Sequence, residues 1–412
     1  MRRRSALLAA AGIAAGAVVA AGVAALAVAG GPAGRGLVAR ADRRRNAVTG
    51  DGVAGDGVAV SERARELHAT LRVVDLHADS LFWGRDLLVR SSVGHVDVPR
   101  LIEGNIALQG FAIATRVPRN VSMERNEVDA FDDVTLIALG LGWPRPAMRD
   151  PLARALHLAE RAAALAAASE GRLAIIRSRS DLRDHLARRE ADPRLTACFL
   201  ALEGAHPLTG DPSQIEGLVD RLVEAGYRMM GPSHFLDTEF AGSAHGAAKG
   251  GLTALGRELV ALLEARSVIV DLAHASPAAI DDVIADARRP VVVSHAGVRA
   301  TCDSVRNLTD EELRAVAGTG GLVGIGFWPG AVCGEDPASI ARAIEHAVSV
   351  VGVRHVALGS DFDGAVSAPF DAAGLARLTE ALLEAGFAET AIQAVMGENA
   401  LRLLDESLPT GA

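Results

Sequence analysis

Seven side chains that could bind metal ions or transfer protons follow short apolar runs in this sequence. Four are histidines and three are carboxylates, and each stands near the end of a segment with the composition of a buried strand. Imidazole and carboxylate are the usual zinc ligands in proteins, and a carboxylate can join two ions. The residues are His77, Asp79, Glu203, His234, His274, His295 and Asp361.

The spacing of these residues predicts two neighbouring metal ions. His77 and Asp79 are separated by one residue, which places both side chains on the same side of an extended chain, where they can bind one ion. His274 and His295 follow consecutive predicted strands and can bind a second, with Glu203 between the two ions. Two ions roughly 3.5–4 Å apart can hold a hydroxide and polarise a carbonyl group. Asp361 is then left as a proton carrier.

Several other residues have a structural interpretation beside the functional one. His234, taken alone, could equally be a satisfied core histidine. Asp75 and Asp271 could each hydrogen-bond to a ligand histidine, and Asp271 could instead cap the next helix. Arg306 could bind a substrate carboxylate through its planar guanidinium, or form a surface ion pair. Trp83 could line the substrate pocket or the core. His206 and His245 fall near the same predicted rim, but no motif gives them a role.

The elements that must position these groups alternate regularly from Ser61 onward. Short apolar runs, typical of parallel strands covered on both faces, alternate with Ala- and Leu-rich helical patterns. Eight strands alternating with helices predict an α/β protein with a (β/α)8 barrel of the TIM type, in which the strand ends converge on one face. A doubly wound sheet is the main alternative. The predicted strands are 72–76, 107–114, 196–202, 227–231, 268–272, 290–294, 321–326 and 355–359.

Capping signals predict where several helices begin. Ser276 followed by Pro277 predicts a helix over 278–287. Thr309 with Glu312 forms a capping box before a helix that Gly318 can end. Thr253 can cap a helix over 254–264. The segment 115–195 is too long for one crossover and is expected to carry extra helices, including 152–169.

Composition excludes several classes of protein. The 412 residues are 50% hydrophobic and carry a formal net charge of −9, which argues against disorder and against a nucleic-acid partner. The three cysteines are too few for a disulfide framework. Cys198 lies in an apolar run and is expected in the core, whereas spacing alone does not decide whether Cys302 and Cys333 pair.

The N-terminal residues 1–31 predict a transmembrane or signal segment. Three arginines precede an uncharged apolar stretch long enough to cross a bilayer, for which roughly 20 residues suffice. A signal-peptide core is only about 7–15 residues long, which favours an uncleaved anchor, although a small-residue cleavage site lies near Ala27–Ala29.

Residues 32–60 are basic and then Gly-rich, and predict a linker before a catalytic domain over 61–408. We expect this domain outside the cytoplasm, anchored or exported, although the arginines after the apolar segment favour the opposite orientation.

The motifs resemble those of the membrane dipeptidase family, also called the renal dipeptidase family or peptidase family M19. The resemblance covers about Val73 to Leu404, nearly the whole predicted domain. It rests on VDLHADS, ALEGAH, GPSHF, DLAHAS, VVVSHAG, the Arg306-Asn307 pair in DSVRNLT, GSDFDG and GENALRLL.

The resemblance implies a dipeptidase with two Zn²⁺ ions per chain on a metal-dependent hydrolase barrel. His77 and Asp79 would bind the first ion, His274 and His295 the second, and Glu203 both. By the same resemblance His234 would contact the substrate and stabilise the tetrahedral intermediate, Arg306 would hold the substrate carboxylate, and Asp361 would carry the proton to the leaving amine. Dimerisation is common in the family, so the resemblance also implies a homodimer.

The main departure from the family pattern is FLDTEFAGSAHG after His234, which puts dipeptide preference in doubt. The sequence therefore predicts a zinc-dependent dipeptidase in which a hydroxide activated by two metal ions attacks the peptide bond of dipeptides. The alternatives are a related amidohydrolase-type barrel enzyme acting on another amide, lactam or ester, and a membrane-tethered barrel that binds a metal or a partner without turnover.

Overall fold

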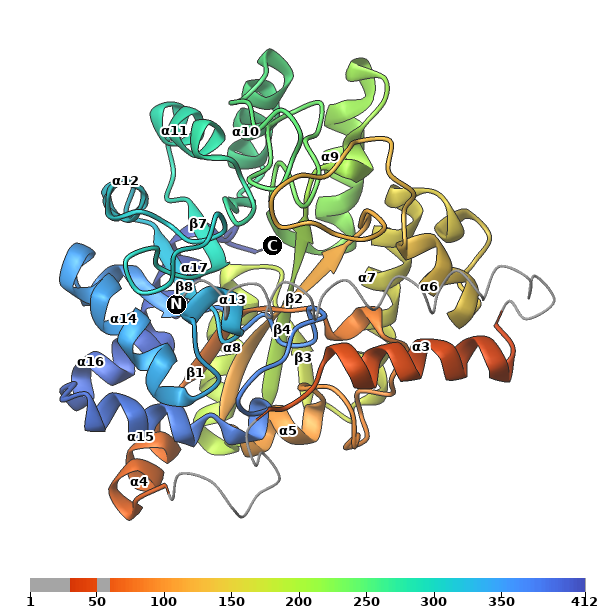
Figure 1. Cartoon of the computed structure of the whole chain (residues 1–412). Coiled ribbons are helices and arrows are strands. Elements are labelled where there is room, and N and C mark those ends of the chain that lie inside the picture. Colours follow the sequence, from red (N-terminus) through yellow and green to blue (C-terminus); the bar gives the residue numbers. More distant parts are fainter. Residues whose placement is uncertain (1–29, 50–59, 412) are drawn as a thin grey trace, which may run out of the picture.

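The computed structural model of the chain describes residues 30–49 and 60–411 (Figure 1). Residues 1–31, predicted as a transmembrane or signal segment, fall almost entirely outside these ranges. Within the described ranges, no helix combines the length and the apolar character that crossing a bilayer requires.

The strands form a closed parallel barrel. The described residues contain one nine-stranded sheet in the order β6-β5-β4-β2-β1-β9-β8-β7, with β3 pairing β4 outside this path. An isolated parallel bridge between Asp271 and Val292 joins the β6 side to β7 and closes the ring of eight. The predicted TIM-type barrel is therefore confirmed. The strands are β1 (Val73–Ala78), β2 (Ile106–Ala114), β3 (Leu173–Ile175), β4 (Thr196–Glu203), β5 (Tyr227–Met230), β6 (Ile269–Val270), β7 (Val292–Ala296), β8 (Leu322–Ile325) and β9 (Val356–Leu358).

Two details differ from the predicted strands. β3 was not predicted; it pairs with the first half of β4, and β5 pairs with the second half of the same edge. β1 and β7 begin and end later than predicted, so His77 and His295 lie within their last residues rather than beyond them. Register shifts interrupt the pairing at these ends, between Asp75 and Ala78 and between Val293 and Ala296.

Helices surround the strands on all sides (Figure 1). The predicted caps are present: Ser276 accepts a hydrogen bond from the Ala279 amide, and Thr309 with Glu312 forms a reciprocal capping box. The long segment after β2 carries three helices. The helices are α3 (Pro32–Arg45), α4 (Glu62–Thr70), α5 (Val98–Glu103), α6 (Val134–Leu141), α7 (Pro151–Ala168), α8 (Arg179–Ala191), α9 (Ile215–Ala225), α10 (Ala254–Ala265), α11 (Pro277–Asp286), α12 (Asp310–Gly318), α13 (Pro329–Val332), α14 (Pro337–Val351), α15 (Ala376–Glu384), α16 (Glu389–Gln393) and α17 (Asn399–Ser407).

The core has two layers. One apolar cluster takes at least one side chain from each of the eight barrel strands, together with apolar residues of the C-terminal helix α17. A larger cluster lies between the strands and the surrounding helices. The inner members from the strands are Val74, Leu108, Phe199, Met229, Ile269, Val292, Leu322 and Ala357.

The segment 32–60, predicted as a linker, begins with the ordered helix α3, which packs against α6. Its helical pattern was hard to recognise because Gly34, Val38 and Asp42 are its buried residues, and one of these is charged. The part of this segment over 50–59 lies outside the described residues.

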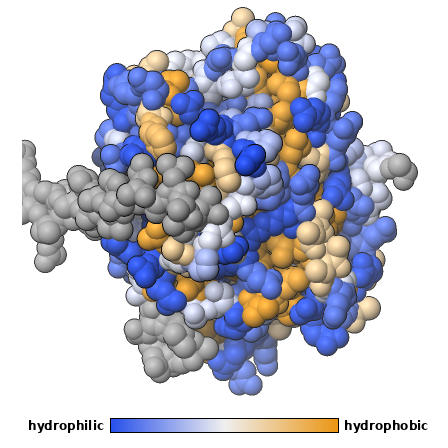
Figure 2. Space-filling view, turned by 90° about the vertical axis from the view of Figure 1, so that its right-hand side faces the viewer, coloured by the Kyte–Doolittle hydropathy of each residue, from blue (hydrophilic) through white to orange (hydrophobic). Residues whose placement is uncertain are grey.

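Apolar and polar side chains mix on the face seen in Figure 2. Large apolar side chains are exposed in the described part of the chain chiefly in the segment between β2 and α6, where Val121, Met123, Val128 and Phe131 are 39–49% exposed.

Candidate active site

A first group of predicted ligands, His77, Asp79 and Glu203, meets at the carboxyl end of the barrel. The Nε2 atom of His77 lies 3.5 Å from Asp79 Oδ2 and 3.3 Å from Glu203 Oε1. All three side chains are buried, and one donor atom from each lies within 4.8 Å of the others. This spacing suits a single metal ion.

Glu203 also belongs to a second group, with His274 and His295. Its other oxygen, Oε2, lies 3.2 Å from His274 Nε2 and 4.0 Å from His295 Nε2. The two Nε2 atoms are 3.0 Å apart. One carboxylate oxygen of Glu203 therefore faces each group, and the structure brings together all five residues predicted as ligands.

The chemistry of these donors fits metal ions. The buried Nε2 atom of His77 has no hydrogen-bond partner among the described residues. Burial lowers the pKa of His274 and of His295 well below the usual value, which favours the neutral ring that a metal requires. Burial and the nearby charge of Glu203 raise the pKa of Asp79 to about 7. Buried carboxylates in contact are costly unless a cation lies between them.

Ser294 supports two of the ligand rings, and sequence reasoning missed it. Its hydroxyl lies 2.9 Å from His295 Nδ1 and 3.3 Å from His77 Nδ1. A hydroxyl can donate to one ring and accept from the other, which orients both Nε2 atoms toward Glu203. A serine that stands beside a histidine in an apolar strand was the only signal available.

The backbone is strained at two of the site residues. His274 has a φ of 67° and Asp361 a φ of 60°, in the left-handed region that residues other than glycine rarely adopt. Such conformations persist only where surrounding contacts hold them, and they are common at functional sites.

Asp361 lies at the edge of both groups. Its Oδ1 atom is 4.0 Å from His77 Nε2, and it forms a third set of close donors with His77 and His295. Burial raises the pKa of Asp361 well above its ordinary value; the charges of His77 and Arg306 oppose this shift, and those of Asp79 and Glu203 add to it. A carboxyl group with a raised pKa is suited to proton transfer.

His234 contacts the shared carboxylate directly. Its Nε2 atom lies 3.1 Å from Glu203 Oε2, and its Nδ1 atom is buried without a hydrogen-bond partner among the described residues. Its ring meets that of His274 edge to face, with centroids 4.4 Å apart. His234 therefore lies inside the site.

Arg306 is buried beside the second group, not exposed in a surface ion pair. Its Nη2 atom donates to the carbonyl oxygen of His295 at 2.7 Å, and its guanidinium lies 6.0 Å from the ring centroid of Trp328. No carboxylate of the described chain lies within ion-pair distance of it, and burial lowers its pKa to about 10. A buried cation without an anionic partner is suited to an anionic ligand.

The loop that carries Arg306 is tied to the next strand's loop. Cys302 and Cys333 form a disulfide, so the pairing that spacing left open is present. Asn307 adds donated hydrogen bonds to the carbonyl oxygens of Cys302 and Ala331. Cys198 is free and buried, as predicted.

Three further predictions can be compared with the contacts. Asp75 accepts from the backbone amide of His77 and from Ser360, and Asp271 accepts from the amides of Ala273 and Ser294. Asp75 therefore makes the predicted hydrogen bond to a ligand histidine, at the backbone amide of His77, whereas the described residues show no such bond for Asp271. Trp83 donates to the Asp363 carbonyl oxygen and is buried in the core.

His206 and His245 lie beside the site as buried, neutral rings. Burial lowers the pKa of each to about 3. His245 Nδ1 donates to the Met123 carbonyl oxygen at 2.8 Å, and the centroids of the His245 and His274 rings are 5.4 Å apart. The sequence predicted that both residues lie near the rim of the barrel, and this is confirmed.

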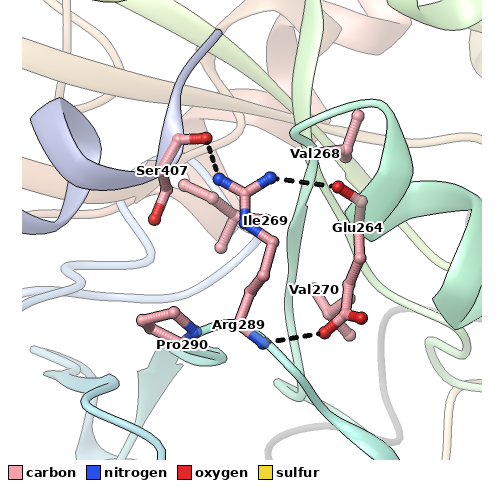
Figure 3. A pocket seen from close by; sticks show the side chains of 7 residues that line it. All are labelled: Glu264, Val268, Ile269, Val270, Arg289, Pro290 and Ser407. Carbon is pink, nitrogen blue, oxygen red and sulfur yellow. Dashed lines mark hydrogen bonds between the residues drawn. The ribbon is translucent and has the colours of Figure 1, made fainter.

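A small cavity lies at the opposite, amino end of the strands (Figure 3). Arg289 spans it, donating to the carbonyl oxygens of Glu264 and Ser407. Its volume is about 10 Å³, room for a single water molecule, so it is not a substrate site.

The profile of the membrane dipeptidase family, peptidase family M19, matches residues 61–408. An uncharacterised protein of the pqqA 5′ region of Klebsiella pneumoniae is 32% identical over 256 residues, which cover 58% of this chain and 91% of that protein.

Two solved structures share the fold. The metallopeptidase dipeptidase AC of family M19 has a TM-score of 0.67 and 25% identity, covering 82% of this chain and 99% of its own. A metallopeptidase from Rhodobacter sphaeroides, solved with a phosphinate mimic of the dipeptide L-Ala-D-Ala, has a TM-score of 0.66 and 24% identity over 82% and 99% of the two chains. The chain belongs to the membrane dipeptidase family, peptidase family M19, and is a metal-dependent hydrolase of peptide bonds.

Proposed function

We propose that this chain is a zinc-dependent dipeptidase that holds two ions. His77 and Asp79 would bind one, His274 and His295 the other, and Glu203 both. The observation that carries this proposal is the position of Glu203, whose Oε1 lies 3.3 Å from His77 and whose Oε2 lies 3.2 Å from His274. Bound zinc would supply a nucleophile from water at neutral pH and polarise the scissile carbonyl group.

The remaining groups act on the substrate. Arg306 binds the free carboxylate of the dipeptide, which explains why a buried guanidinium lacks an internal anion. His234 donates a hydrogen bond to the carbonyl oxygen as negative charge develops on it. Asp361, whose pKa is raised by burial, holds a proton and gives it to the leaving amine.

The proposed substrates are dipeptides with a free C-terminal carboxylate, including those that end in a D-residue. The ligand of the Rhodobacter relative, a mimic of L-Ala-D-Ala, supports this class. The segment 235–246, which departs from the family pattern, contributes the Phe235 and His245 rings that lie near His274, so it would set the side-chain preference.

A dipeptide panel with matched C-terminally amidated peptides tests the proposal. With zinc added, we expect cleavage of the free dipeptides, loss of cleavage with a chelator, and little cleavage of the amides. Equal cleavage of both sets would remove Arg306 from its role and favour the amidohydrolase alternative.

Metal analysis should give two zinc ions per chain. Asp361→Asn should keep this metal content and lose turnover; loss of metal would instead make Asp361 a ligand.

We further propose that the catalytic domain lies outside the cytoplasm, either anchored by residues 1–31 or exported. The Cys302–Cys333 disulfide supports an oxidising compartment. Membrane fractionation of the full chain, with and without residues 1–31, tests the anchor. A homodimer, which the family resemblance implies, stays a prediction for a sedimentation measurement.

A further inference from the structure

Residues 30–49, named here the N-terminal strap, lie beside the loop that follows Asp361. The side-chain oxygen Oδ1 of Asn46 accepts a hydrogen bond from the Ala365 amide at 2.9 Å. The backbone continues this contact, because Ala368 donates to the Ala47 carbonyl oxygen at 3.0 Å and Thr49 donates to that of Ala368 at 2.9 Å. The strap precedes the residues that match the family.

The loop beside the strap is held in an unfavourable conformation. Asp361, Asp363 and Ala365 have φ values of 60°, 63° and 62°, so three non-glycine residues within five positions are left-handed. This backbone needs external partners to persist, and Asn46 provides the one for the Ala365 amide.

A second connection passes through buried charges. Asn46 Nδ2 donates to Asp42 Oδ1 at 2.8 Å, and Asp42 Oδ2 lies 2.9 Å from Arg85 Nε. Arg85 in turn pairs with Asp363 through Nη2 and Oδ2 at 2.6 Å. Asp42, Asn46 and Asp363 are at most 2% exposed. The strap is therefore connected to the loop at Asp363 through Arg85, as well as directly at Ala365.

We propose that Asn46, together with Asp42, is a positioning residue for Asp361. The strap fixes the left-handed turn over 361–365 and thereby holds the Asp361 carboxyl group at the site, 4.0 Å from His77 Nε2. The effect of the strap on turnover rests on the proposed function, through the role of Asp361. The effect of the strap on the conformation of residues 361–365 does not.

Three variants of the full chain test this proposal. Asn46→Ala removes the acceptor for the Ala365 amide. Arg43→Ala is the control, an exposed residue of the same helix α3. The double variant Asp42→Asn with Asn46→Asp exchanges the two side chains, which restores an acceptor for Ala365 and a donor between positions 42 and 46.

The measurements are hydrogen–deuterium exchange of residues 361–368 and dipeptide kinetics. For Asn46→Ala we expect faster exchange in this loop, a kcat lower by roughly tenfold, since small misplacements of reacting groups are costly, and KM and zinc content close to wild type. The double variant should recover both slow exchange and kcat, and Arg43→Ala should match wild type.

Unchanged exchange over 361–368 in Asn46→Ala would overturn the proposal, whatever the substrate of the enzyme. A change in KM without a change in kcat would also overturn it, and so would equal exchange rates in Arg43→Ala and Asn46→Ala. Failure of wild type to cleave any dipeptide would overturn the proposed function alone, because the exchange measurement does not depend on it.

Discussion

Two positions on strand β4 experience opposite environments. Phe199 is completely buried in the cluster to which all eight barrel strands contribute apolar side chains. Glu203, the last residue of the same strand, is buried among His77, His234 and His274, each within 3.3 Å of one of its oxygens. One strand thus provides stability at one position and chemistry four residues later, and the two properties should respond separately to substitution.

The backbone follows the same division. His274, Asp361 and Asp363 adopt left-handed conformations at the carboxyl end, where buried ring nitrogens of His77, His234 and His274 also lack partners. Strain and unpaired polar groups reduce stability, so ring nitrogens that stay unpaired around Glu203 indicate a ligand site.

The largest expected effect is that of Glu203→Gln. This change removes the carboxylate that both groups share, so we expect the zinc content to fall and dipeptide turnover to drop by at least roughly 10²–10³-fold. Zinc analysis and kinetics measure these effects, with the exposed Glu190→Gln as the control. Full zinc content in Glu203→Gln would contradict the shared-ligand arrangement.

Phe199→Ala should have the converse effect. Truncating a fully buried phenylalanine leaves a cavity and should lower the free energy of unfolding by about 3–5 kcal/mol. Urea denaturation measures the loss. Zinc content per folded chain should stay at the wild-type value; a selective loss of zinc would show that the inner core and the site are not separable.

His68, on helix α4, should make the stability of the folded chain depend on pH. Burial lowers its pKa from 6.5 to about 4, and its ring contacts Thr379 and the Gly104 carbonyl. The unfolded chain therefore binds a proton between pH 6.5 and 4 that the folded chain does not, and stability falls as the pH falls through this window. The free energy of unfolding should fall by about 3 kcal/mol in total because of this proton.

The matched measurement compares wild type with His68→Gln in urea at pH 7, 6, 5 and 4. The difference in unfolding free energy should shrink as the pH falls, because only wild type loses the His68 contribution. Parallel curves for the two proteins would disprove this role of His68.

The smallest effect is expected for Ser294→Ala. Without the hydroxyl, the rings of His77 and His295 lose the partner of Nδ1, and zinc affinity should fall about tenfold. Competition with a chelator measures the affinity, and the exposed Ser349→Ala is the control. Equal affinities in the two variants would mean that packing alone orients the rings.

The sequence predicted most of the barrel and the ligands because both follow simple rules. Apolar runs alternate with capped helices, and ionisable residues such as Glu203 at the ends of such runs are too costly to bury without a purpose. Ser294 could not be predicted, because a serine in a strand has no distinctive pattern. Helix α3 was missed for a related reason. It is held through Asp42 and its C-cap residue Asn46 by partners far away in the chain, and a periodic apolar pattern does not predict such contacts.

The disulfide between Cys302 and Cys333 has a practical consequence for handling the enzyme. Dithiothreitol, added routinely during purification, would release the loop that presents the Arg306 guanidinium from its covalent tether. Inhibitor screens for carboxylate-containing compounds are therefore best run without thiols, and a host that secretes the protein is the better source of material.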